Sequence, residues 1–159
     1  MSSVFMLIGI PGSGKTTYAK NILLKKYPSA VLISSDEVRN NNPSMEEKDI
    51  WVEIYRLCKE NIEKNIDIIY DATNITPNVR HRFDDKLKEY NLKYEKVAYY
   101  FITNTNSCYE RVIKRNTKEN ERFLPPEVVL SYGAKIIPPS IIEGFSDIFL
   151  IDNNSDLKG

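Results

Sequence analysis

Short, continuous apolar runs alternate along the chain with longer stretches in which apolar residues recur at helical spacing. Runs of this length with no polar alternation are typical of strands buried on both faces, as in a parallel sheet. We therefore predict strands at the following residues: 4–10, 30–33, 66–70, 97–102 and 147–151.

The stretches between these runs are predicted to be helices. Residues 15–26 have a helical pattern that the Tyr-Pro pair at 27–28 ends, because a residue before proline avoids the helical region. Residues 45–65 carry an apolar stripe that includes Cys58, which predicts a packed thiol. A cap and a first-turn proline begin a helix at 76–77.

Two more helices are predicted near the carboxyl end of the chain. Ser107 and Glu110 have the spacing of a capping box, and the helix that they begin is expected to end near Arg115. A Pro-Pro pair at 125–126 begins the next helix. The polar residues between the two helices, about 116–125, are expected to form a mobile lid.

Strands that alternate with helices predict an α/β fold, here a single domain over residues 1–159. The sheet is expected to be five-stranded and mostly parallel with helices on both faces, and ligands bind such sheets beyond the carboxyl ends of the strands. Four polar or glycine residues are predicted to meet at that edge, namely Gly14, Asp36, Asp71 and Thr73.

The composition is that of a folded globular protein, with 42% hydrophobic and 28% charged residues. A formal net charge of +0 provides no global field for nucleic acid, so polyanion binding has to come from local cation clusters. The candidates are Arg80, His81 and Arg82, and the run Lys114, Arg115, Lys118 and Arg122, although charge runs on helices are often solvated faces.

The apolar run at 4–10 is too short to span a bilayer and has no preceding basic residue, so we expect a cytoplasmic location and no membrane partner. The only cysteines, Cys58 and Cys108, lack the spacing of a redox or metal site. With one histidine, a zinc site is not expected, whereas a magnesium site built from carboxylates and phosphates needs neither residue type.

Residues 9–16, GIPGSGKT, match the P-loop spacing and lie between an apolar strand and a helix. Glycines let successive N–H groups surround phosphates, the helix start adds its positive end, and Lys15 adds a full charge. The residues predicted to bind ATP here are Gly9, Pro11, Gly12, Ser13, Gly14, Lys15, Thr16 and Thr17. Thr16 is also a predicted Mg²⁺ ligand.

Asp36 and Arg39 follow the second strand and are predicted to form the second half of a catalytic site. Their spacing allows both side chains to reach one face of a helical turn. An aspartate there accepts the proton of an attacking hydroxyl, and the arginine stabilises the charge that develops on the phosphate. The alternative is that Asp36 only caps a helix.

Asp71 ends the third strand and is predicted either to bind Mg²⁺ or to orient its loop through Thr73 and Asn74. Asp71, Thr73 and Asn74 are also predicted to contact the substrate. Three cations bracket the predicted lid, namely Arg115, Lys118 and Arg122. They are expected to close over ATP, unless they belong to a solvated face.

Four segments, taken in order, carry a family resemblance: GIPGSGKTT, ISSDEVR, IIYDATNITPNVR and ERVIKRNTKENERFLP. Over residues 4–136 the chain resembles the 5′-hydroxyl polynucleotide kinase family of bacteriophages and bacterial RNA-repair enzymes. The resemblance implies a P-loop kinase fold and transfer of the γ-phosphate of ATP to a nucleic-acid 5′-hydroxyl. It also implies that Asp36 is the general base and that Arg39 binds the reacting phosphate or the adjoining nucleotide.

In the same resemblance, Asp71 and Thr73 lie near the acceptor or the metal, and Arg115, Asn116 and Lys118 match an R-N-x-x-[KR] lid pattern. Two features depart from the family: a Leu-Pro stands where Val-Pro is more common, and there is no D-x-D-G-T phosphatase motif. The alternatives are kinases of a small molecule, of aminoacyl-tRNA or of a hydroxymethylated base in DNA. An ATP-hydrolysing switch or binding module is the remaining alternative.

Overall fold

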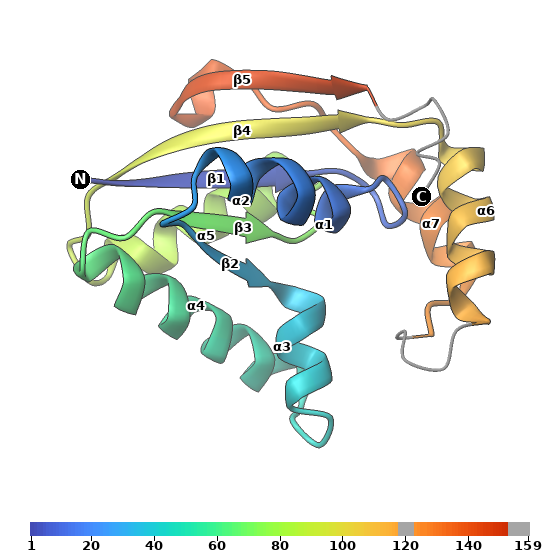
Figure 1. The fold of residues 1–159 in the computed structure, drawn as a ribbon, viewed down its shortest axis with the longest axis horizontal. Helices are drawn as coiled ribbons and strands as arrows, with labels where there is room; N and C mark the ends of the chain where they lie inside the picture. Colours follow the sequence, from blue (N-terminus) through green and yellow to red (C-terminus); the bar gives the residue numbers. More distant parts are fainter. Residues whose placement is uncertain (118–122, 153–159) are drawn as a thin grey trace.

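A computed structural model describes residues 1–117 and 123–152 of the chain, and its centre is a five-stranded sheet (Figure 1). The strand order is β2-β3-β1-β4-β5, and every neighbouring pair is parallel. The strands are β1 (Ser2–Ile8), β2 (Val31–Ser34), β3 (Ile68–Asp71), β4 (Tyr94–Ile102) and β5 (Phe145–Asp152). The predicted α/β architecture with a parallel sheet is therefore confirmed.

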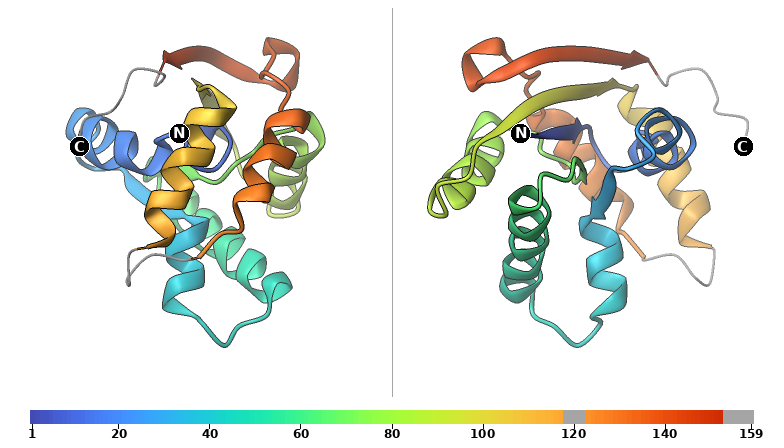
Figure 2. Two further views of the ribbon diagram at one scale, coloured as in Figure 1. Left: turned by 90° about the vertical axis from the view of Figure 1, so that its right-hand side faces the viewer. Right: turned by 60° about the vertical axis from the view of Figure 1, so that its left-hand side comes forward.

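Helices cover both faces of the sheet because its central strand is apolar on both sides. Val4, Met6 and Ile8 of β1 belong to one buried cluster, whereas Phe5 and Leu7 belong to another. The first cluster also includes residues of α3 (Ser35–Asn41), α4 (Glu47–Glu63) and α5 (Pro77–Lys88), and Figure 2 shows α3 and α4 side by side.

The helical segment that follows the first strand packs on the opposite face. It comprises α1 (Lys15–Tyr18), the π-helical turn η1 (Ala19–Leu23) and α2 (Leu24–Lys26). Cys58 is fully buried among the residues of α4 that face the sheet, as its place on the apolar stripe predicts. No described helix is both long enough and apolar enough to cross a membrane.

Two helices, α6 (Thr105–Asn116) and α7 (Pro126–Lys135), stand beyond the carboxyl ends of the strands (Figure 1). A third apolar cluster joins them to the loops after β1 and β3. It comprises Ile10 and Ile75 from those loops, Cys108 and Val112 of α6, Val129 of α7, and Leu124, which precedes α7. A short 3₁₀ turn, η2 (Ile141–Glu143), leads from α7 towards β5.

Helix α6 begins earlier than the sequence pattern predicts. Its N-cap is Asn104, whose side chain accepts hydrogen bonds from the backbone N–H groups of Asn106 (2.8 Å) and Ser107 (3.3 Å). The prediction that Ser107 is the cap is therefore wrong. Asparagine and serine cap about equally well, and Asn104 comes first where the chain leaves β4.

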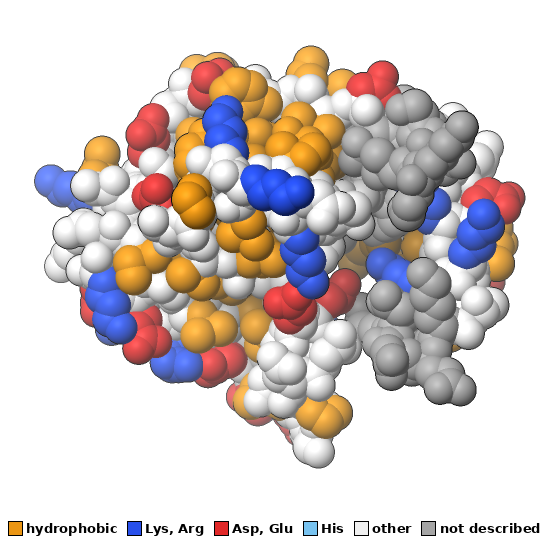
Figure 3. Space-filling model, in the orientation of Figure 1, with side chains coloured by type: hydrophobic (Ala, Val, Ile, Leu, Met, Phe, Trp, Pro, Cys, Tyr) orange, Lys and Arg blue, Asp and Glu red, His pale blue; other side chains and the backbone are white. Residues whose placement is uncertain are grey.

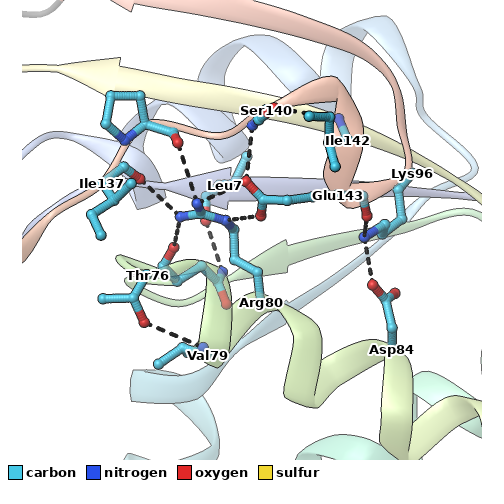
Figure 4. Close-up of polar contacts among 12 residues, drawn as sticks. Leu7, Thr76, Val79, Arg80, Asp84, Lys96, Ile137, Ser140, Ile142 and Glu143 are labelled. Carbon is cyan, nitrogen blue, oxygen red and sulfur yellow. Dashed lines mark hydrogen bonds and ion pairs between the residues drawn. The ribbon is translucent and has the colours of Figure 1, made fainter.

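Arg80 is fully buried, so its prediction as a polyanion-binding residue is also wrong. Its Nε donates to Glu143 at 2.6 Å, and its Nη1 donates to the carbonyl groups of Asn74 (2.8 Å) and Ile137 (3.1 Å) (Figure 4). Nη2 donates to Glu143 and to the carbonyl of Pro138. One guanidinium therefore joins α5, the loop after β3 and the segment that follows α7.

Replacing Arg80 with methionine is expected to lower the free energy of unfolding by about 3–5 kcal/mol, because it leaves Glu143 and several carbonyl groups without their donor. Urea denaturation measures this loss. Arg82→Met is the matched control, since Arg82 is exposed on the same helix. A loss no larger than that of the control would contradict a structural role for the Arg80 contacts.

Candidate active site

A cleft of about 620 Å³ opens at the carboxyl edge of the sheet, and Figure 3 shows it as the hollow between the projection that contains α3 and the lobe that contains α6. The predicted site residues that line it are Pro11, Gly12, Gly14, Lys15, Thr16, Thr17, Asp36, Arg39, Asp71, Thr73 and Arg115. Gly9, Ser13 and Asn74 are not among its lining residues. Lys118 and Arg122 lie outside the described residues, as does part of the predicted lid.

The turn between β1 and α1 approaches α6 closely. Gly12 and Gly14 have φ values of 82° and 88°, in the left-handed region that favours glycine. A Cβ on Gly12 would lie 2.6 Å from the carbonyl oxygen of Cys108 in α6. The glycine therefore allows this turn and α6 to pack directly against each other.

Lys15 is the first residue of α1 and is buried. Its Nζ donates to the carbonyl of Ile10 at 3.1 Å. Burial lowers the pKa of Lys15, whereas the carboxylates of Asp71 and Asp36 act in the opposite direction. A cation with so little water around it interacts strongly with any charge that enters the cleft.

Thr16 and Asp71 lie together next to Lys15. The Thr16 hydroxyl donates to the Asp71 carboxylate at 2.6 Å. Burial raises the pKa of Asp71, and the nearby Lys15 opposes that rise. The described residues contain no group of three or more His, Cys, Asp or Glu side chains that could hold a metal. Mg²⁺ needs only one or two protein oxygens when phosphates supply others, so this hydroxyl-carboxylate pair fits it.

The loop after β3 turns Asn74 away from the cleft. Asn74 is buried with a φ of 49°, and its side-chain amide donates to the carbonyl groups of Leu7 (2.8 Å) and Ala72 (3.3 Å). The N–H of Gly9 donates to the carbonyl of Thr73 at 3.0 Å. These bonds join the loop to the end of β1, and they give Asn74 a structural position rather than the predicted contact with substrate.

Asp36 and Arg39 share one face of α3, as their spacing predicts, and Arg39 Nη1 donates to Asp36 Oδ1 at 3.0 Å. The N-cap of this helix is Ser34, whose hydroxyl accepts from the N–H of Glu37. Capping is therefore done by Ser34, and Asp36 lies in the first turn with its carboxylate at the cleft.

The sequence did not predict two residues of α4 that line the cleft, Glu47 and Trp51. Glu47 accepts from Arg39 Nε at 3.1 Å and from Nη2 at 2.6 Å. The indole N–H of Trp51 donates to the same carboxylate at 3.2 Å, and Arg39 Cζ lies 5.6 Å from the centre of the indole ring. Their i, i+4 spacing predicts that Glu47 and Trp51 share a helix face, but no sequence signal joins them to α3.

The opposite wall adds two arginines of α6. Arg111, which was also missed, donates from Nη1 to the carbonyl of Gly12 at 3.1 Å, and its i, i+4 spacing from Arg115 was the available signal. The Nε of Arg115 is buried and makes no hydrogen bond within the described part of the chain. Arg115 also lies close enough to Lys15 to disfavour its charged form. Cations that converge in this way fit a polyphosphate.

Comparison with known proteins places the chain in a family. The family model described as "AAA domain" (AAA_33) matches residues 4–139. The chain belongs to this AAA-domain family. Among solved structures, the AAA-domain chain is similar to a putative kinase from Chloroflexus aurantiacus, with a TM-score of 0.75 and 13% identity over 97% of this chain and 89% of the other.

Two further structures are similar to this AAA-domain protein. A fungal RNA kinase gives a TM-score of 0.72 and 18% identity, with 99% of this chain and 76% of the other covered. Chaetomium thermophilum Kti12, solved in complex with ADP-AlF3, gives a TM-score of 0.71 and 18% identity, with 97% and 91% covered. These neighbours show that the fold is a kinase-like P-loop fold.

Proposed function

We propose that this protein transfers the γ-phosphate of ATP to a hydroxyl group, and that the acceptor is the 5′-hydroxyl of a DNA or RNA end. The observation that carries the proposal is that one cleft contains both the P-loop with Lys15 and, on a different helix, the Asp36–Arg39 pair. Hydrolysis by a switch protein requires no separate carboxylate for an acceptor hydroxyl, whereas transfer benefits from one.

On the nucleotide side, the P-loop N–H groups, Lys15, Arg111 and Arg115 bind and orient the phosphates. Thr16 and Asp71 would hold the Mg²⁺, which would supply positive charge against the negative charge of the phosphates. The Kti12 neighbour was solved with ADP-AlF3, which supports an adenine nucleotide as the ligand.

On the acceptor side, Asp36 takes the proton as the hydroxyl oxygen bonds to the γ-phosphorus, and the bond from that phosphorus to the β-phosphate oxygen breaks to release ADP. Arg39 binds oxygens of the transferring phosphate and stabilises their charge. A fungal RNA kinase among the similar structures and the family resemblance of the sequence both support a nucleic-acid acceptor. The net charge of +0 is consistent with a short footprint of a few nucleotides.

The test is transfer of label from γ-labelled ATP to a panel of 5′-hydroxyl DNA and RNA oligonucleotides, nucleosides, sugars and aminoacyl-tRNA. We expect labelled oligonucleotides, and oligonucleotides already phosphorylated at the 5′ end serve as the control. Label that appears only on a nucleoside or a sugar would show that the acceptor is a small molecule and not a nucleic-acid end. Release of labelled phosphate with no acceptor-dependent product would contradict transfer and favour a hydrolysing switch.

Replacing Arg115 with alanine is expected to raise the KM for ATP about tenfold or more, because a buried charge-assisted contact to phosphate is worth roughly 1.5–3 kcal/mol. The KM for the oligonucleotide should change little. Lys114→Ala is the matched control, since Lys114 is the neighbouring cation on α6 and is exposed. Equal effects of the two substitutions on the KM for ATP would remove Arg115 from the nucleotide site.

A further inference from the structure

Among the described residues that line the cleft, Arg39 of α3 is the only cation on the side of Asp36, Glu47 and Trp51. Its contacts with the protein leave some of its N–H donors for a ligand. A guanidinium has five N–H donors. Glu47 accepts one from Nε and one from Nη2, and Asp36 accepts one from Nη1. One N–H on Nη1 and one on Nη2 therefore have no protein partner in the described part of the chain.

These two N–H groups stand on neighbouring nitrogens, which is the spacing that matches two oxygens of one phosphate. Their direction depends on Glu47, because its two carboxylate oxygens lie 3.1 and 3.2 Å from Nε and so fix the plane of the guanidinium. Trp51 holds Glu47 in turn through its indole N–H, and its ring lies against Arg39.

We propose that Glu47 is a positioning residue for phosphate transfer, which fixes the guanidinium of Arg39 so that its two remaining N–H groups face the reacting phosphate. The inference rests on the proposed role of Arg39. An unrestrained arginine side chain has rotamer entropy to lose on binding, and a restrained one has already lost it. Without Glu47, Arg39 is also able to turn its paired donors onto Asp36 and engage the base that has to accept the proton.

The substitution Glu47→Gln tests the inference, because the amide keeps the shape but offers Arg39 one acceptor and an N–H group that repels it. We expect kcat to fall about tenfold to a hundredfold, the cost of a misplaced catalytic group, with little change in the KM for ATP. Asp49→Asn is the matched control, since Asp49 is the other acidic residue in the first turn of α4 and is exposed. It removes the same favourable charge at the helix start without touching Arg39.

A double-mutant cycle separates positioning from a general effect on the fold. In an Arg39→Ala background, Glu47→Gln should cause no further loss of kcat, because the group that Glu47 positions is gone. The melting temperatures of Glu47→Gln and Asp49→Asn should agree. A wild-type kcat for Glu47→Gln, or a full additional loss in the Arg39→Ala background, would overturn the inference.

The fluorescence of Trp51, the single tryptophan of the chain, gives a second measurement that does not need activity. Glu47→Gln changes the emission both by displacing Arg39 from the indole and by altering the acceptor of the indole N–H, so its shift should be larger in the wild type than in the Arg39→Ala background. Asp49→Asn should keep the wild-type emission. A shift of the same size in the two backgrounds overturns the hold of Glu47 on Arg39. If the wild-type protein transfers no phosphate to any acceptor, the proposed function is wrong, and the emission still decides whether Glu47 holds Arg39.

Discussion

The substitution Asp36→Asn is expected to slow phosphate transfer about a hundredfold to ten-thousandfold, which is the usual contribution of a general base. Asparagine keeps the shape of the side chain and accepts a hydrogen bond from Arg39, but it cannot take the proton of the acceptor hydroxyl. ATP affinity should change little, because the P-loop lies on another element. Single-turnover transfer and ATP binding, measured on the same variant, separate chemistry from binding.

The fold should tolerate this substitution, because the hydroxyl of Ser34 and not the carboxylate of Asp36 caps α3. Losing the ion pair with Arg39 and one acidic charge in the first turn should cost about 1 kcal/mol or less. Glu37→Gln is the control, since Glu37 is also in the first turn and pairs with Lys20 on the exposed surface. A transfer rate near that of the wild type would remove Asp36 from the mechanism.

Replacing Lys15 with alanine is expected to slow transfer to every acceptor about a thousandfold, because the transition state loses several kcal/mol of electrostatic stabilisation. The side chain supplies a fixed positive charge where the phosphates gain negative charge, and burial leaves little water to take its place. The measurement is the initial rate of label transfer at saturating acceptor. Lys25→Ala is the control, because Lys25 is exposed in the same helical segment.

Loss of Lys15 should leave the fold intact. Burial lowers the pKa of this lysine, so its charged form is disfavoured in the folded protein, and removing it takes away no net stabilisation of the fold. Lys15→Met is the companion variant, which retains most of the buried volume and removes the charge together with the hydrogen bond to the carbonyl of Ile10. If either variant keeps more than a tenth of the wild-type transfer rate, Lys15 does not act on the reacting phosphates.

The sequence predicts those parts of the site whose residues are close together in the chain. Residues 9–16 carry their own turn, with glycines where φ is positive and a lysine at the helix start. Asp36 and Arg39 are three residues apart on one helix, so helical geometry alone brings them together. The carboxyl ends of parallel strands then bring Asp71 to the same edge.

Contacts between distant elements explain what the sequence left out. Arg111 reaches the carbonyl of Gly12 across 99 positions, and Arg80 reaches Glu143 across 63. A charge run does not show which arginine is buried until the packing of α5 against the segment after α7 is known. Glu47 meets Arg39 for a similar reason, because only the packing of α3 on α4 brings two surface charges into one cleft.

Asn116, the last residue of α6, pairs with the backbone of Leu124 in both directions. Its amide donates to the Leu124 carbonyl at 2.7 Å, and its side-chain oxygen accepts the Leu124 N–H at 2.9 Å. The two ends of the intervening stretch are thus fixed by one side chain. Because loop-closure entropy rises by only about 0.6 kcal/mol for each doubling of length, inserting residues between Asn116 and Leu124 costs little as long as this pairing persists. Such an insertion is therefore expected to leave Arg111, Arg115 and the apolar cluster that contains Val112 and Leu124 in place.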